Sequence, residues 1–376
     1  MTDVAINRSG RLKFPFVREL DGIRACAILL VFVSHLGTMG RLVPGGLGVT
    51  LFFFLSGFLI TSLLRAEAAT TGRIDLGQFY ARRTLRIFPP LYITLAFSGV
   101  LVALGLVARD PDWPSVTAQL LFVSNYARWW GWEQGLPGPP LWSLAVEEHF
   151  YLVFPAIFAL LLMKLSGRRA ALTCAILCLV PLAFRLVNGL VYGEVAMNYV
   201  MSHTRIDSIL FGCCLALWQN PVLDKDAWKP GPIAVVLGIG AVLVAALVRD
   251  PFFGDTWRYT IQGAGMFVAF SWVLHGTRWT SAILNWAPLQ LIGRYSYTLY
   301  LVHWLFISLI TTWSPVPLPL AVVGAGTMVL SMLYAAAMFY VVERPLARIR
   351  HRLHREPAPA PEIESVATGD PQPRAA

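Results

Sequence analysis

Ionisable side chains that suit acid–base chemistry lie inside segments that are otherwise apolar. His35 ends one apolar run, and the adjacent carboxylates Glu147 and Glu148 lie in another. A lone histidine among apolar residues can simply bond to a neighbouring helix. An imidazole together with a carboxylate that orients it, however, is the combination that activates a hydroxyl. We therefore interpret His35 and Glu148, with Glu147 beside it, as candidate catalytic residues.

The spacing of these residues predicts which helix faces carry them. Arg24 precedes His35 by eleven residues, which on an α-helix is about 20° from the same face and ~16 Å along the axis. One face therefore carries an arginine near one end and a histidine near the other. Ser143 lies four residues before Glu147 and shares its face.

Three arginines precede a Pro-Pro pair in the segment FYARRTLRIFPPLY. Arg82 and Arg86 are four residues apart, and Arg83 and Arg86 are three apart, so they are neighbours on a helix. One interpretation is ordinary anchoring of a membrane protein by basic residues. The other is a phosphate clamp, because the guanidinium fork matches phosphate oxygens. Both interpretations stay open on spacing alone.

Further polar residues lie in other apolar segments. Arg205 and Asp207 are two residues apart, and a structural ion pair and a functional role are equally plausible for them. His303 shares a helix face with Ser296 and Tyr300. We expect Arg205 and Asp207 at the depth of the candidate catalytic residues and His303 somewhat deeper. Charges inside a bilayer cost about 2.5–3.5 kcal/mol each, which marks them as functional candidates.

The small residues Ser56 and Gly57 interrupt a run of large ones in LFFFLSGFLIT. Small residues in membrane segments usually allow two helices to pack closely, and we favour that interpretation. A close approach of a ligand to the Gly57 backbone is the alternative.

Several common kinds of site have no signature in this sequence. It has no glycine-rich nucleotide loop, no HExxH and no G-x-S-x-G. The five cysteines follow no zinc or disulfide spacing, and we expect them to be buried as small apolar residues. We therefore expect no metal and no permanently bound cofactor. The cysteines are Cys26, Cys174, Cys178, Cys213 and Cys214.

The composition is that of a membrane protein. Of 376 residues, 56% are hydrophobic and 14% are charged, against roughly 25% charged in a soluble domain. The net charge of +9 comes from basic residues scattered between apolar runs, which argues against a nucleic-acid partner. Asp21 and Arg24 interrupt the first apolar run, so we expect a retained helix and not a cleaved signal peptide.

We predict an all-α integral membrane protein with about ten transmembrane helices of ~20 residues each. Segments bounded by charges, proline and glycine define them, and the proline-rich region 110–140 is expected to be the longest loop. The helices are expected near 20–39, 46–64, 89–108, 141–163, 170–190, 199–218, 231–248, 260–276, 293–312 and 317–342.

The distribution of basic residues predicts the orientation. With a cytoplasmic N-terminus, 22 of the 30 Lys and Arg residues fall in cytoplasmic segments and only 5 in outer loops, as the positive-inside rule requires. Both termini are then cytoplasmic. The expected parts are a cytoplasmic segment 1–18, a transmembrane domain 19–346 and a tail 347–376 that is too rich in Pro and Ala to fold.

Seven motifs, in order along the chain, resemble the membrane-bound acyltransferase-3 family. The resemblance runs from about residue 16 to 346; each motif is weak by itself, but seven in order are highly specific. They are ELDGIRACAILLVFVSH (19–35), GVTLFFFLSGFLI (48–60), FYARRTLRIFPPLY (79–92), LWSLAVEEHFYLVFP (141–155), RIDSILFGCCLA (205–216), SYTLYLVHW (296–304) and VVERP (341–345).

Members of this family O-acylate glycans and other hydroxyl-bearing acceptors. The resemblance implies that His35 is the catalytic base, with Glu148 and Glu147 assisting it. One departure is His149, where the family often has Gln. The donor-binding residues implied are Arg24, Arg82, Arg83 and Arg86. The supporting residues expected are Ser56, Gly57, Trp142, Ser143, Arg205, Asp207, Tyr300 and His303.

The expected activity is transfer of an acyl group from cytoplasmic acyl-CoA to a hydroxyl of a glycan or glycolipid at the inner cell membrane. Acetyl is the first candidate for the acyl group. Acyl-CoA is thus a co-substrate, and membrane lipid and the acceptor are the other partners. Direct attack on the thioester and a transient acyl-histidine are both open. A secondary metabolite such as a macrolide sugar is an alternative acceptor.

A flippase for a lipid-linked saccharide is the alternative of another class, since it would also use charges within the membrane. Transporters often contain inverted repeats and paired broken helices, and the sequence shows neither. The arginine cluster also favours an enzyme.

Overall fold

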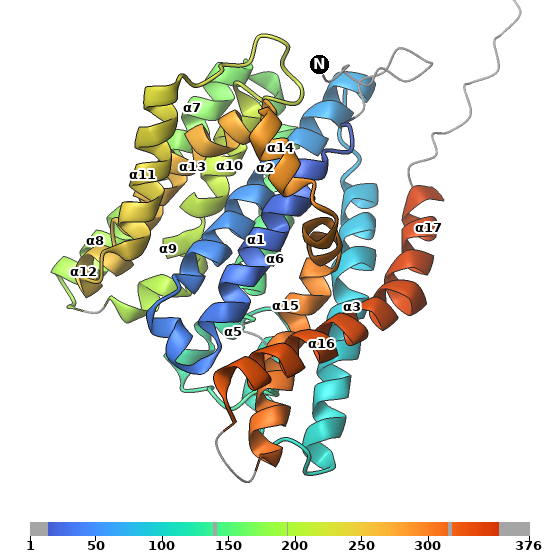
Figure 1. Ribbon diagram of the computed structural model, residues 1–376. Helices are drawn as coiled ribbons and strands as arrows, with labels where there is room; N and C mark the ends of the chain where they lie inside the picture. Colours follow the sequence, from blue (N-terminus) through green and yellow to red (C-terminus); the bar gives the residue numbers. More distant parts are fainter. Residues whose placement is uncertain (1–13, 138–140, 194, 315–317, 353–376) are drawn as a thin grey trace, which may run out of the picture.

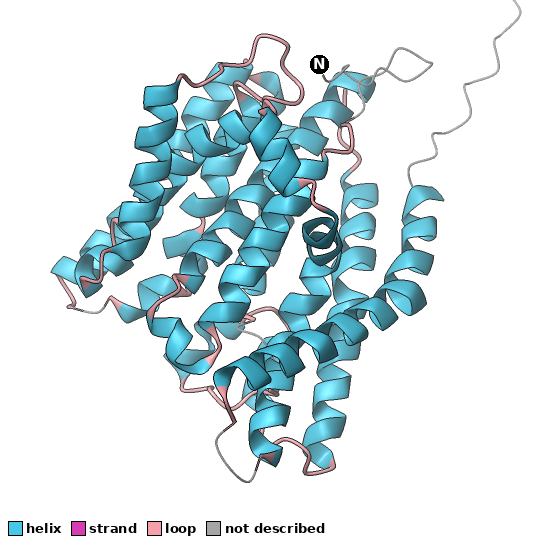
Figure 2. Cartoon of the chain, viewed as in Figure 1, coloured by secondary structure: helices cyan, strands magenta, loops and turns pink. Residues whose placement is uncertain are grey.

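The computed structural model describes residues 14–137, 141–193, 195–314 and 318–352, and over these residues the chain forms helices and no strands (Figures 1 and 2). The α-helices are α1 (Arg18–Ser34), α2 (Gly45–Thr71), α3 (Leu76–Ala103), α4 (Trp113–Leu120), α5 (Ser124–Ala127), α6 (Trp142–Leu160), α7 (Gly167–Leu177), α8 (Leu179–Leu190), α9 (Ser202–Arg205), α10 (Asp207–Leu217), α11 (Pro232–Leu247), α12 (Pro251–Asp255), α13 (Arg258–Leu274), α14 (Arg278–Leu284), α15 (Ala287–Trp313), α16 (Leu320–Met338) and α17 (Arg344–Arg352). A short π-helix, Phe339–Glu343, joins α16 to α17.

Each of the ten expected segments contains helix, and five helical stretches of the described chain are long and apolar enough to cross a membrane. These stretches are Gly45–Thr71, Leu76–Ala103, Trp142–Lys164, Gly167–Leu190 and Leu320–Arg350. Large apolar side chains point outward from the bundle, among them Leu152 on α6, Val236 on α11 and Leu333 on α16, each more than 60% exposed. Such surfaces suit contact with hydrocarbon.

The third helix begins earlier than predicted. We expected it near residue 89, but α3 begins at Leu76, because the Asp75 side chain accepts a hydrogen bond from the Gln78 amide and caps the helix. Pro89 and Pro90 therefore lie inside the helix, and the three arginines lie on it. The region 110–140 also contains the short helices α4 and α5, so it is not entirely a loop.

Helix α2 packs closely against α10 at the centre of the bundle. A Cβ on Gly57 would collide with the carbonyl oxygen of Ile209, and one on Gly212 would collide with that of Phe54. The two glycines thus allow the two backbones to touch. The packing interpretation of Gly57 is the one the structure bears out.

Helix α1 lies between α2 and α15 (Figure 1). Glycines again allow close approach: a Cβ on Gly48 of α2 would collide with the carbonyl oxygen of Ala27, and one on Gly293 of α15 would collide with that of Asp21. These two crossings hold α1 against the helices that carry Ser56 and His303.

The bundle has two distinct ends. At one end Arg65 of α2 forms a 2.7 Å ion pair with Asp224, and Glu19 of α1 accepts a 3.0 Å hydrogen bond from Ser281. We call this the basic end, because the arginine-rich starts of α1 and α3 lie there. At the opposite end, the histidine end, the Asn125 amide donates to the Ser202 hydroxyl at 2.9 Å. His35 caps the end of α1 there.

We expect Gly57→Ala to destabilise the protein by about 1–3 kcal/mol, because the added methyl group overpacks the contact between α2 and α10. Thermal unfolding of the purified protein in detergent, followed by tryptophan fluorescence, measures the change. Gly240→Ala in α11 is the matched control, since no atom lies within 4 Å of its Cβ position. Equal unfolding temperatures for the two variants would contradict the prediction.

Candidate active site

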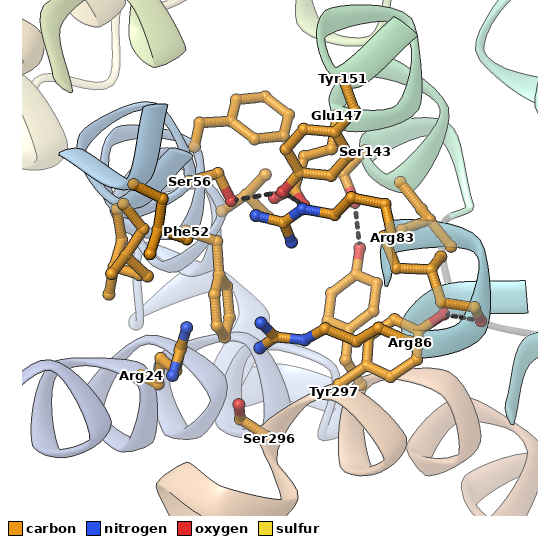
Figure 3. A pocket seen from close by; sticks show the side chains of 18 residues that line it. Arg24, Phe52, Ser56, Arg83, Arg86, Ser143, Glu147, Tyr151, Ser296 and Tyr297 are labelled. Carbon is orange, nitrogen blue, oxygen red and sulfur yellow. Dashed lines mark hydrogen bonds between the residues drawn. The ribbon is translucent and has the colours of Figure 1, made fainter. Parts of the chain in front are cut away.

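A cavity of about 180 Å³ lies between α1, α2, α3, α6 and α15. Figure 3 shows its lining, to which α2 contributes apolar side chains and the Ser56 hydroxyl, while the other helices contribute charged and further hydroxyl groups. Seven of the residues predicted from the sequence line it. They are Arg24, Ser56, Arg83, Arg86, Ser143, Glu147 and Tyr300.

Three arginines of the lining carry positive charge into the cavity (Figure 3). Arg24 comes from α1 and forms a 2.8 Å ion pair with Asp21. Arg83 and Arg86 come from α3, and neither forms an ion pair within the described part of the chain. The cavity therefore presents guanidinium groups that remain available to an anionic ligand.

Arg82, which the sequence grouped with these arginines, lies in a different environment. Its guanidinium lies 3.3 Å from a carboxylate oxygen of Glu67 and 3.3 Å from the amide oxygen of Gln78. It is not among the residues that line the cavity. The structure does not bring Arg82 to the cavity with Arg83 and Arg86, because its guanidinium is held by Glu67 and Gln78.

Glu147 joins a chain of three oxygen atoms in the cavity wall. The Tyr151 hydroxyl lies 3.0 Å from Oε2 of Glu147 and 3.0 Å from the Ser56 hydroxyl. The Arg83 guanidinium lies over the Tyr151 ring, 4.6 Å from its centroid. Tyr151 thus connects α6 to α2 and lies beside a positive charge.

Glu148 lies outside the cavity lining. Its Oε1 atom is buried and has no hydrogen-bond partner within the described residues. We expected Glu148 to orient His35, but the structure gives His35 another partner.

That partner is His303. Its Nδ1 atom lies 2.8 Å from the carbonyl oxygen of Tyr300 and 3.1 Å from that of Leu299. Carbonyl oxygens only accept, so Nδ1 carries the proton and Nε2 of the neutral ring is an acceptor. Nδ1 of His35 lies 3.0 Å from this Nε2 and therefore donates to it.

The hydrogen bonds fix the tautomer of both rings. A neutral His35 that donates from Nδ1 keeps an unprotonated lone pair on Nε2, which is what a general base requires. The His303 side chain is fully buried, and the His35 ring also packs edge-on against Trp304 at 4.9 Å. We therefore correct the expected pairing: His303, and not a glutamate, orients His35.

Tyr300 lies between the cavity and the histidine pair. Its hydroxyl lies 2.6 Å from that of Ser143 in the cavity lining. Its ring centroid is 5.8 Å from that of His303, and its carbonyl oxygen holds His303 Nδ1. The cavity and the histidine pair thus share one residue.

Arg205 and Asp207 do not pair with each other. Asp207 forms a fully buried 2.7 Å ion pair with Arg185 of α8, a partner that the sequence did not single out. Arg205 is also fully buried, and its guanidinium lies 3.7 Å from the centroid of Tyr259 and 5.6 Å from that of Trp142. Asp207 therefore acts structurally, while Trp142 packs on Arg205 at the edge of the site.

Four aromatic residues of the cavity lining were not among the predicted site residues: Phe52, Phe53, Tyr151 and Tyr297. For Tyr151 a signal was present, because it follows Glu147 by four residues and so shares its helix face. Phe52 and Tyr297 carried no signal, since an aromatic residue in a membrane helix is ordinary.

A comparison with protein families matches residues 17–339 to the model of the acyltransferase-3 family, described as an acyltransferase domain. Among curated proteins, the O-acetyltransferase OatA of Staphylococcus aureus strain NCTC 8325 / PS 47 is 30% identical over 89% of this chain, and OatA of strain COL matches equally. The matched region is 57% of each relative. The chain thus spans a little over half the length of these relatives. No solved structure matches it.

We expect Asp207→Ala to lower the free energy of unfolding by about 3–5 kcal/mol, because it leaves the buried Arg185 guanidinium unpaired. Thermal unfolding of the purified protein in detergent measures the loss of stability. Asp226→Ala, at an exposed position, is the control and should stay within about 0.5 kcal/mol of the wild type. A fully stable Asp207→Ala protein would show that Asp207 is not a structural residue.

Proposed function

This chain belongs to the acyltransferase-3 family, and on that premise we propose that it is a membrane O-acyltransferase that uses acyl-CoA. The acyl group, for which acetyl is the first candidate, goes to a hydroxyl of a glycan or glycolipid at the membrane. One observation carries the proposal: an arginine-lined cavity that reaches Tyr300, with a histidine pair of fixed tautomer directly behind it.

The donor side of the proposal rests on Arg24, Arg83 and Arg86. Coenzyme A carries phosphate groups, and guanidinium groups bind phosphate through paired, charge-assisted hydrogen bonds. In the proposed orientation about ten helices cross the inner cell membrane and the basic end faces the cytoplasm, where acyl-CoA is made. The pantetheine arm then enters the cavity and brings the thioester toward Tyr300.

The chemistry of transfer rests on His35. Nε2 takes the proton of the acceptor hydroxyl while the acceptor oxygen attacks the thioester carbonyl carbon. His303 keeps its acceptor atom toward His35 Nδ1, so the ring stays oriented as it gains charge. Arg24 lies ~16 Å along α1 from His35, which suits donor binding and not stabilisation of the oxyanion, and Arg205 is enclosed by aromatic rings.

The acceptor is proposed from the relatives. OatA is named as an O-acetyltransferase, which supports an oxygen acceptor and an acetyl donor for this chain. The histidine end of the bundle would face away from the cytoplasm, and an acceptor presented there reaches His35 without crossing the arginine-lined cavity.

We expect His35→Ala to lower kcat by at least about 100-fold, the usual effect of losing a general base. His303→Ala should also lower kcat, and His303→Gln should retain more activity, because an amide oxygen can still accept from His35 Nδ1. Transfer of radiolabel from acetyl-CoA to glycan extracts by protein in nanodiscs measures these changes. Full activity of His35→Ala would refute the assigned base.

We expect Arg83→Ala and Arg86→Ala each to raise the KM for acetyl-CoA about 10- to 100-fold, since a hydrogen bond to a charged group contributes about 1.5–3 kcal/mol. The neighbouring Arg82→Ala is the matched control, because Arg82 contacts Glu67 outside the cavity. Calorimetric titration with a non-transferable acetyl-CoA analogue gives the same comparison for binding. An equal effect of all three substitutions would indicate general electrostatics and no specific clamp.

A further inference from the structure

The cavity wall contains a chain of hydroxyl and carboxyl groups that the proposed transfer has not used. It runs from the Ser56 hydroxyl on α2 through the Tyr151 hydroxyl to the Glu147 carboxyl on α6, with both oxygen–oxygen distances at 3.0 Å. All three residues line the cavity, and Figure 3 shows them gathered beside the Arg83 guanidinium.

The middle position of Tyr151 suits proton transfer. A phenol hydroxyl donates one hydrogen bond and accepts others, so it can receive a proton from one neighbour while passing its own to the other. A single hydrogen bond would suffice to tie α6 to α2, yet Tyr151 contacts a proton carrier on each side. The chain therefore links a carboxyl group to a hydroxyl at the cavity surface.

Positive charge lies beside this chain. The Arg83 guanidinium is 4.6 Å from the centroid of the Tyr151 ring, and Arg86 lines the same cavity. Both cations favour a negative charge on Glu147 after it has released a proton. The electrostatics therefore stabilise the end state in which Glu147 has lost its proton.

In the proposed transfer, the departing sulfur of coenzyme A would lie near this chain. Ser143, Glu147 and Tyr151 share one face of α6 at four-residue spacing, and Ser143 holds Tyr300 in front of the histidine pair. A thioester whose carbonyl carbon faces the histidine pair places its sulfur one bond back, toward the chain. A bare thiolate in a water-poor cavity is costly, which creates a need for a proton there.

We propose that Glu147, Tyr151 and Ser56 form a general-acid relay that protonates the thiolate of coenzyme A as it leaves. The inference rests on the proposed acyl transfer. The acceptor oxygen forms a bond to the carbonyl carbon, the carbon–sulfur bond breaks, and its electron pair stays on sulfur. Ser56 gives its proton to sulfur, Tyr151 reprotonates Ser56, and the carboxylic acid of Glu147 reprotonates Tyr151.

The proton count closes over one cycle. His35 has gained the proton of the acceptor hydroxyl, and Glu147 has become a carboxylate. Release of one proton from His35 to solvent and uptake of one by Glu147 restores the enzyme. The products are the acyl ester and the free thiol of coenzyme A.

The test compares two donors in three relay variants. Tyr151→Phe, Ser56→Ala and Glu147→Gln should each lower kcat with acetyl-CoA by about 100-fold, typical of a lost general acid. Their KM for acetyl-CoA should change less than about threefold, because the arginines that bind the donor remain. With the selenoester analogue of acetyl-CoA the loss should shrink to about tenfold or less, since a selenolate leaves without protonation.

Tyr80→Phe is the matched control. The Tyr80 hydroxyl on α3 also bonds to α6, at the Leu152 carbonyl oxygen 2.7 Å away, but Tyr80 does not line the cavity. Its kcat should stay within about twofold of the wild type with both donors. This variant separates loss of a link to α6 from loss of the relay.

The outcomes distinguish the relay from the transfer on which it rests. Unchanged kcat in Tyr151→Phe, or an equal loss with thioester and selenoester, would overturn the relay while wild-type transfer still supports the proposed function. Absence of transfer by the wild type with either donor would overturn the proposed function and the relay with it. Recovery by the selenoester in all three variants supports the relay.

Discussion

Polar groups buried among apolar helices have only protein atoms as partners, and this constraint organises the bundle. Asp207 and Arg185 neutralise each other at 2.7 Å without exposure, and His303 directs one ring nitrogen to the backbone of its own helix and the other to His35. A group without such a partner in hydrocarbon costs several kcal/mol. Arg83 and Arg86 form no ion pair within the described residues, and both line a cavity, which is where a ligand can supply a counter-ion.

Close helix crossings bring the separate polar groups into one site. Gly57 and Gly212 let the backbones of α2 and α10 touch, and the neighbouring Ser56 is thereby turned toward the cavity. Gly293 lets α15 approach α1 at its basic end, so that His35 and His303 meet near the other end of the same helix pair. Small residues thus act on the chemistry indirectly, by setting the distance between helices.

The proposed function separates donor binding from proton removal in space. Arginines lie on the side of the cavity toward the basic end, the Ser56–Tyr151–Glu147 chain lies in its wall, and the histidine pair lies beyond Tyr300. In the proposed transfer, acyl-CoA held between them would have cations for its phosphates, an acid for its sulfur and a base for the incoming hydroxyl. The proposed direction of transfer follows from this order.

Sequence alone determined the helical, apolar character of the chain and most of the polar residues of the cavity, because hydrophobic runs and i,i+4 spacing are local properties. It also predicted that Arg24 and His35 lie near opposite ends of one helix face. Only the tertiary structure decided which residues contact each other. His35 bonds to His303 and not to Glu148, and Asp207 pairs with Arg185 and not with Arg205. The cavity also excludes Arg82. A hydrogen bond across 268 residues depends on how two helices rotate and cross, and no local pattern encodes that geometry.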